Sequence, residues 1–159
     1  MLQVNPEAPD RRTRILDAAE SCFVRAGFHQ ATMQDIAAEA GMSAGDLYRY
    51  FASKEALVEG LCERDRGEVA ADFAEFEGAR DFMSVFAALG RKHFEEEPRE
   101  KAVLCLQIWA EATRSDRIAK VMSAFNQDIV DRLTALLDTA REAGSIAPMI
   151  ESRIIARII

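Results

Sequence analysis

Apolar residues recur at helical spacing through nearly the whole chain, and this periodicity restricts the fold more than any other feature. Between residues 13 and 26, six apolar residues stand at offsets 0, 3, 4, 7, 8 and 11: Ile15, Ala18, Ala19, Cys22, Phe23 and Ala26. These offsets fall on one face of an α-helix. No convincing alternating pattern of the kind that β-strands show competes with them. With 49% hydrophobic residues among 159, the chain can also bury a substantial core, so the sequence predicts an all-α protein.

Capping residues divide the first part of the chain into short helices. Gly27 closes the first helix, and Thr32 is predicted to cap a second one, with Asp35 three residues later. Ser43 is predicted to cap a third helix in the same way, with Asp46 three residues later. Only "GMS" separates the second helix from the third. Two short helices joined by a tight turn and supported by a longer helix form a helix-turn-helix.

The third of these helices has distinct faces. At about 100° per residue, Leu47 and Phe51 point inward and Arg49 points away from them, while Tyr48 and Tyr50 lie about 80° to either side of the buried direction. Outward residues of such a helix could meet base edges in a major groove while the two phenols reach the phosphates of its walls. In an isolated segment, the commoner interpretation would be that the two tyrosines are ordinary half-buried aromatic residues and that Arg49 is a solvated charge. The helix-turn-helix context favours the DNA-binding one.

The rest of the sequence predicts further helices. A longer helix begins at Ser53 and is interrupted at Gly78, and apolar stripes follow at 82–93 and 118–140. The run "AVLCLQIWA" after Pro98 is apolar nearly all round, so we expect its helix to be deeply buried.

Residues 13–61, "TRILDAAESCFVRAGFHQATMQDIAAEAGMSAGDLYRYFASKEALVEGL", resemble the N-terminal domain of the TetR/AcrR family of transcriptional regulators. The resemblance implies a dimeric, ligand-responsive repressor whose two recognition helices read a palindromic operator. It also implies two domains, an N-terminal arm with the helix-turn-helix at 1–52 and a helical effector-binding and dimerisation domain at 53–159.

The resemblance assigns roles to nine residues at the expected DNA surface. Those at positions that commonly contact phosphates are Thr32, Ser43, Tyr48, Tyr50 and Lys54. Those at positions that commonly meet bases are Ala44, Gly45, Asp46 and Arg49. Asp46 departs from the small or amide residues frequent at its position. Either its carboxylate accepts a hydrogen bond from a cytosine N4 or it serves the helix cap, and we favour the cap.

An effector pocket in the regulatory half should be mostly apolar with a few polar groups. The candidate wall is Phe73, Phe86, Trp109, Met122 and Phe125, and the candidate polar groups are His93 and Gln107. Any of the aromatic residues can equally be core, and His93 fits a core or boundary histidine better than a ligand contact. Gln107 is the stronger candidate, because an unpaired buried amide costs about 1–3 kcal/mol. These residues predict a small-molecule effector that is largely apolar.

The last residues, "ESRIIARII", begin an apolar helix that stops part-way, so either the sequence is truncated or this helix packs on something outside the chain. Family members usually continue with two further helices, which form the homodimer as a four-helix bundle. The resemblance therefore implies that the chain is truncated and that its isoleucines begin the dimer interface: Ile150, Ile154, Ile155, Ile158 and Ile159.

Composition excludes several other classes of protein. Three cysteines spaced 40 and 43 residues apart in apolar runs suggest reduced core thiols, not a disulfide framework or zinc site. The glutamates at 95–97 lack a histidine or cysteine at ligand spacing, so we expect no metal and no cofactor. The sequence shows neither a membrane span nor a signal peptide, which predicts a cytoplasmic protein without a membrane partner.

The expected function is therefore a ligand-responsive transcriptional regulator with double-stranded DNA as its partner. An enzyme is disfavoured, because no phosphate loop, nucleophile elbow or paired carboxylates with credible spacing are present. The net charge of -7 argues mildly against nucleic acid binding, although it averages over the whole surface. That acidity keeps open an alternative, a helical protein-interaction module that retains the fold without sequence-specific DNA binding.

Overall fold

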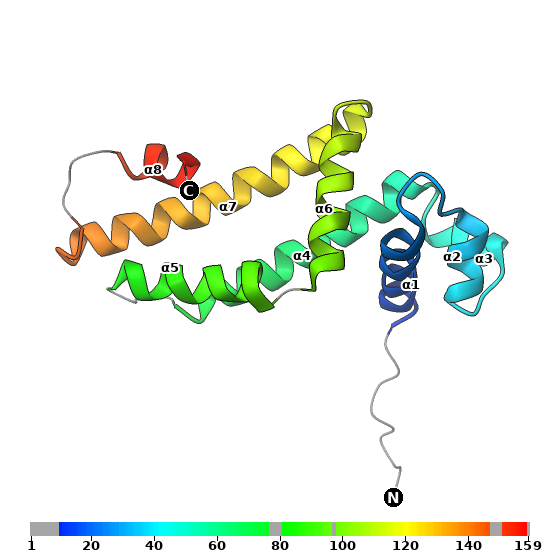
Figure 1. Ribbon diagram of the computed structural model, residues 1–159, viewed down its shortest axis with the longest axis horizontal. Coiled ribbons are helices and arrows are strands. Elements are labelled where there is room, and N and C mark those ends of the chain that lie inside the picture. Colours follow the sequence, from blue (N-terminus) through cyan, green and yellow to red (C-terminus); the bar gives the residue numbers. More distant parts are fainter. Residues whose placement is uncertain (1–9, 77–80, 97, 147–150, 159) are drawn as a thin grey trace, which may run out of the picture. The chain divides into compact units, whose positions relative to one another are not determined.

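The computed structural model describes residues 10–76, 81–96, 98–146 and 151–158, and all regular structure within these ranges is helical (Figure 1). The all-α prediction is confirmed. In chain order the elements are α1 (Arg11–Ala26), α2 (Met33–Glu39), α3 (Ala44–Tyr50), α4 (Lys54–Ala74), α5 (Phe82–Gly90), the π-helical turn η1 (Arg91–Glu96), α6 (Arg99–Ala112), α7 (Asp116–Glu142) and α8 (Ser152–Ile158).

The helices form two compact units, each assembled from two separate stretches of chain. The first unit combines the chain up to Leu61 with Arg99–Ala119, and the second combines Cys62–Pro98 with Lys120–Ile159. Helix α6 therefore belongs with the N-terminal helices, whereas α4 and α7 each contribute to both units. The functional boundary predicted near residue 52 stays a prediction.

The first unit is built around α1, which packs against α2 and α6, while α2 packs against α3. Its core draws apolar side chains from each of these helices and from the start of α4. Fully or almost fully buried are Ile15, Leu16, Cys22, Phe23, Ile36, Leu47, Leu57 and Val58. Burial of each large side chain contributes about 1.5–3 kcal/mol. Since Leu47 is α3's buried residue, this packing determines which face of α3 remains at the surface.

The second unit has its own core, formed by α5, α7 and α8. Its members are Phe82, Val85, Leu89, Val130, Leu133, Leu136, Leu137, Ala140 and Ala156. Phe73 and Phe86 pack partly buried against it. Beside them, the buried carboxylate of Asp72 pairs with Lys92, and its Oδ2 lies 3.2 Å from His93 Nε2. His93 Nε2 thus lies next to a buried carboxylate of α4 without a hydrogen bond to it.

Helix α6 is not deeply buried, so that prediction was wrong. Leu104 and Ile108 are buried, but Val103 and Trp109 are exposed and Leu106 is 69% exposed. Leu104 and Ile108 are four residues apart and form a single stripe, and α6 packs against α1 in the first unit. One neighbouring helix covers only one side of an apolar helix, whatever the composition of its other sides.

The final helix, α8, also buries only some of its apolar side chains. Ala156 joins the second core and Ile155 packs against it, whereas Ile154 and Ile158 are exposed. Ile150 and Ile159 of the predicted interface lie outside the described residues, as do Gly78 and most of the predicted N-terminal arm.

Candidate nucleic-acid interface

Thr32 caps α2 with a reciprocal set of hydrogen bonds, as the sequence predicts. The Asp35 N–H donates to Thr32 Oγ1 at 3.1 Å, and the Thr32 N–H donates to Asp35 Oδ2 at 3.0 Å. The Thr32 hydroxyl also donates to Asp35 Oδ2, at 2.6 Å. The hydroxyl and then the backbone N–H of Thr32 stabilise the carboxylate, so the pKa of Asp35 is lowered.

The turn between α2 and α3 is fixed by backbone and side-chain hydrogen bonds. The Met42 N–H donates to the Ala37 carbonyl at 2.9 Å, and Gly41 adopts a φ of +67°, a conformation that favours glycine. From α1, Arg14 Nη2 donates to the Ala40 carbonyl at 2.9 Å. No local sequence pattern indicates this contact of Arg14, which ties α1 directly to the turn.

Helix α3 presents the faces that its helical projection predicts. Leu47 is completely buried and Phe51, just after the helix, is also buried. The Arg49 side chain is 81% exposed, while Tyr48 and Tyr50 are 52% and 46% exposed. Three adjacent residues thus offer a guanidinium and two phenols to solvent, supported underneath by buried apolar residues.

The first turn of α3 is organised by Ser43 and Asp46. The Asp46 N–H donates to Ser43 Oγ at 3.1 Å, which confirms Ser43 as the cap, and the Ser43 hydroxyl donates to Asp46 Oδ2 at 2.8 Å. The other carboxylate oxygen, Oδ1, lies 4.0 Å from Arg49 Nη1. Asp46 is therefore shared between the cap and Arg49. Ala44 is half-buried beside it, and Gly45 is exposed.

Lys54 begins α4 and reaches back to the corner between α1 and α2. Its Nζ donates to the carbonyls of Phe28 and His29 at 2.6 and 3.1 Å, and it lies 4.7 Å from the centre of the Phe28 ring. An ammonium group has three N–H donors, so these carbonyls use two of them. Lys54 thus holds the corner and retains one donor for another acceptor.

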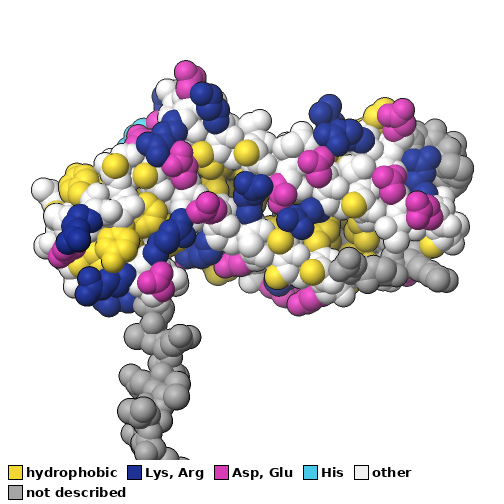
Figure 2. Space-filling model, turned by 180° about the vertical axis from the view of Figure 1, so that it is seen from behind, with side chains coloured by type: hydrophobic (Ala, Val, Ile, Leu, Met, Phe, Trp, Pro, Cys, Tyr) yellow, Lys and Arg dark blue, Asp and Glu magenta, His cyan; other side chains and the backbone are white. Residues whose placement is uncertain are grey.

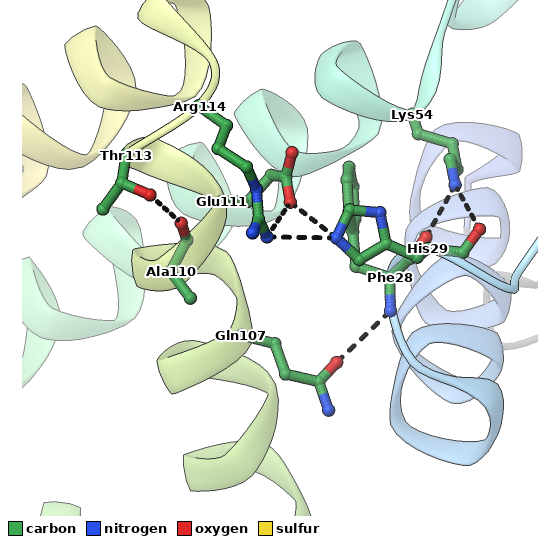
Figure 3. Close-up of polar contacts among 8 residues, drawn as sticks. All are labelled: Phe28, His29, Lys54, Gln107, Ala110, Glu111, Thr113 and Arg114. Atoms are coloured by element: carbon green, nitrogen blue, oxygen red, sulfur yellow. Dashed lines mark hydrogen bonds and ion pairs between the residues drawn. The ribbon is translucent and has the colours of Figure 1, made fainter.

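The same corner is held from the other side by α6, as Figure 3 shows. Gln107 Oε1 accepts the Phe28 N–H at 3.2 Å. His29 Nε2 lies 2.8 Å from Glu111 Oε2, to which Arg114 also donates at 3.0 Å. Sequence reasoning missed Glu111 and Arg114, because no local pattern indicates which residue some 80 positions away will meet a helix corner.

The seven predicted effector residues are divided between the two units. Gln107 and Trp109 stand on α6 in the first unit, where Trp109 is exposed and Gln107 bonds to Phe28. The second unit contains Phe73, Phe86, His93, Met122 and Phe125. Of these, Met122 is buried with its sulfur 3.9 Å from that of Cys62. A shared effector pocket stays a prediction.

Other kinds of site receive no support from the described residues. They contain no group of three or more His, Cys, Asp or Glu side chains that could hold a metal ion. None of the described helices is long and apolar enough to cross a membrane. Cys22 and Cys62 are buried as expected, whereas Cys105 is exposed, contrary to the prediction of three core thiols.

In Figure 2, Lys and Arg side chains lie beside hydrophobic side chains on the part of the first unit that the view shows, with Asp and Glu side chains among them. The exposed side chains of α3 are basic and aromatic: Tyr48, Arg49 and Tyr50. A local basic and aromatic surface is the kind that binds a phosphate backbone.

Comparison with known proteins identifies the family. Residues 15–61 match the family described as bacterial regulatory proteins, tetR family. The HTH-type transcriptional regulator UidR of Escherichia coli strain K12 is 32% identical over 162 residues, which cover 100% of this chain and 81% of UidR. The chain belongs to the TetR family of transcriptional regulators. As a TetR-family member it is a transcriptional regulator with a DNA-binding helix-turn-helix, which is a non-enzymatic role.

Solved TetR-like structures agree with this fold. GusR of Salmonella enterica has 27% identity and a TM-score of 0.78, with 99% of this chain and 81% of GusR covered. The transcriptional regulator FadR of Bacillus subtilis, solved in complex with stearoyl-CoA, has a TM-score of 0.79 at 21% identity, covering 92% of this chain and 79% of FadR. The likeness to FadR is one of fold alone.

Proposed function

We propose that this TetR-family regulator is a repressor that binds a palindromic operator as a homodimer and is released by a small, largely apolar effector. The observation that carries the proposal is the exposed face of α3, where Tyr48, Arg49 and Tyr50 project from a helix whose opposite side is buried. Two such helices, one from each protomer, would enter successive major grooves about 34 Å apart.

On DNA, the side chains of this face would contact two different targets, the base edges and the phosphates. Arg49 points directly outward, where its planar fork matches the acceptors of a guanine edge. Tyr48 and Tyr50 flank it and can donate their phenolic protons to phosphates on the two groove walls. The remaining N–H of Lys54 and the hydroxyl protons of Thr32 and Ser43 are further phosphate donors. To donate to a phosphate, each hydroxyl would first break its hydrogen bond to a carboxylate, that of Asp35 for Thr32 and that of Asp46 for Ser43.

Effector release requires a connection from the regulatory helices to α3, and the corner at Phe28 and His29 supplies one. Gln107 and Glu111 of α6 hold one side of the corner, while Lys54 of α4 holds the other. Movement of α6 would therefore pull on the corner that joins α1 to α2. A coupling free energy of about 1–3 kcal/mol is enough to lower DNA affinity roughly 5- to 150-fold.

The nature of the effector follows from the candidate pocket residues. Four of the five candidates in the second unit are aromatic or thioether side chains, namely Phe73, Phe86, Met122 and Phe125. Such a lining fits a largely apolar molecule. The stearoyl-CoA complex of FadR is consistent with this, because it places an acyl ligand on a related fold.

DNA binding by the purified chain tests the proposal. Fluorescence anisotropy with the DNA upstream of its own gene, titrated across salt concentrations, is expected to give a steep salt dependence for the wild type. Arg49→Ala should weaken binding at least about tenfold, and Tyr48→Phe, which removes an uncharged hydrogen-bond donor, should weaken it less and leave the salt slope unchanged. Arg91→Ala, which removes an exposed arginine from η1, is the matched control and should bind normally. Equal binding by the Arg49 and Arg91 variants would favour the protein-interaction module.

A further inference from the structure

Asp46 occupies an unusual place for a carboxylate, on a helix proposed to face DNA. Its two oxygens have different neighbours: Oδ2 accepts the Ser43 hydroxyl at 2.8 Å, and Oδ1 lies 4.0 Å from Arg49 Nη1. The hydrogen bond to Ser43 uses Oδ2, so Oδ1 is the carboxylate oxygen that faces Arg49. The two side chains stand three positions apart, which places them on the same side of α3.

In the free protein this ion pair is weak. The Arg49 side chain is 81% exposed and that of Asp46 is half exposed, so water screens their attraction. A carboxylate at this surface also repels the DNA phosphates. Simple charge attraction to DNA would therefore be better served by a neutral residue at position 46.

The balance changes in a major groove, where α3 and the base edges displace water. A lower local dielectric strengthens the attraction between the carboxylate and the guanidinium. Arg49 has five N–H donors, and Asp46 can hold one side of the fork while the other side faces the bases. A guanidinium fixed in this way loses less side-chain entropy when it binds the N7 and O6 acceptors of guanine.

We propose that Asp46 is a positioning residue that sets the base specificity of Arg49: it holds the guanidinium in the orientation that reads a guanine in each operator half-site, at the expense of overall DNA affinity. The inference rests on the proposed operator binding. It separates two roles of Asp46, because the hydrogen bond to Ser43 serves the cap while the opposite oxygen orients Arg49.

Selection from a pool of randomised double-stranded DNA by the purified full chain tests this inference. The wild type is expected to enrich guanine at one position of each half-site. Asp46→Asn keeps the shape but removes the charge, so it should reduce the preference for guanine at that position about fivefold or more. The same variant should bind unselected DNA at least as tightly as the wild type, because one repulsion of phosphates is gone.

Ser43→Ala is the matched control, since it removes the cap hydroxyl and leaves Asp46 and Arg49 in place. It should weaken binding to all sequences alike and keep the preference for guanine. Melting curves followed by circular dichroism verify that both variants fold. If Asp46→Asn folds and retains the wild-type preference for guanine while Arg49→Ala loses it, the positioning role of Asp46 is refuted. The proposal that α3 binds an operator would still hold in that case. If the wild type enriches no sequence, both fail together.

Discussion

Gly60 of α4 lies close to Leu16 of α1 and to Phe51 at the end of α3, and its replacement by alanine tests the packing that positions the recognition helix. A Cβ at this position would lie 2.9 Å from both Leu16 Cδ2 and Phe51 Cε1. Ordinary carbon contacts are about 3.5–4.0 Å, and both neighbours are buried, so neither can move aside freely. Overpacking of this kind costs about 1–3 kcal/mol.

Gly67 provides a matched control on the same helix. A Cβ there has no described heavy atom within 4 Å. Both substitutions gain the same helix propensity, about 1 kcal/mol, so the difference between the two variants isolates the overpacking. We expect Gly67→Ala to raise the free energy of unfolding and Gly60→Ala to fall about 1–3 kcal/mol below it.

Urea unfolding at 25 °C, followed by circular dichroism at the helical band, measures both variants against the wild type. Because α3 is anchored partly through Phe51, Gly60→Ala should also weaken DNA binding, whereas Gly67→Ala should not. A Gly60 variant that is as stable as the Gly67 variant would refute the close approach of these helices.

Two further predictions concern hydrogen bonds of the first unit. Gln107→Ala removes the acceptor of the Phe28 N–H, so we expect it to lower the free energy of unfolding by about 1 kcal/mol in the same urea assay. An unchanged unfolding midpoint would contradict the role of α6 at the corner formed by Phe28 and His29. Thr32→Val removes the hydroxyl that stabilises the Asp35 carboxylate, so the pKa of Asp35 should rise toward its ordinary value in an NMR titration. Because the pKa of Asp35 is lowered in the folded wild type, its ionised carboxylate stabilises the fold fully at a pH above the ordinary aspartate pKa. This contribution to the free energy of unfolding is lost as the pH falls through the folded-state pKa of Asp35. The variant should lose less stability over that acid range.

The sequence predicts the DNA-facing half well because its signals are local. Caps at Thr32 and Ser43 require only residues three positions away, and the direction of Arg49 follows from helical periodicity once Leu47 is taken as buried. Each of these inferences depends on neighbours within one or two helical turns, where the geometry of the α-helix alone decides the outcome.

The sequence predicts the surroundings of α6 poorly because they depend on distant parts of the chain. The sequence indicates that the amide of Gln107 needs a polar partner but not which one, and in the structure its side-chain oxygen accepts the N–H of Phe28, 79 residues away. The apolar composition of α6 predicts that Leu106 and Trp109 are buried, but both are exposed. Burial depends on how many helices surround α6, and the composition of α6 does not indicate that number. Asp72, the buried partner of Lys92 and His93, was missed for the same reason.

The central claim, that the exposed face of α3 recognises a specific operator, is tested most directly by DNA protection mapping with the purified chain on its own upstream region. The account predicts a symmetric footprint with two protected major grooves about one helical turn apart, lost in Arg49→Ala and retained in Arg91→Ala. A folded wild-type chain that protects no sequence, at a salt concentration where non-specific binding is suppressed, would contradict it.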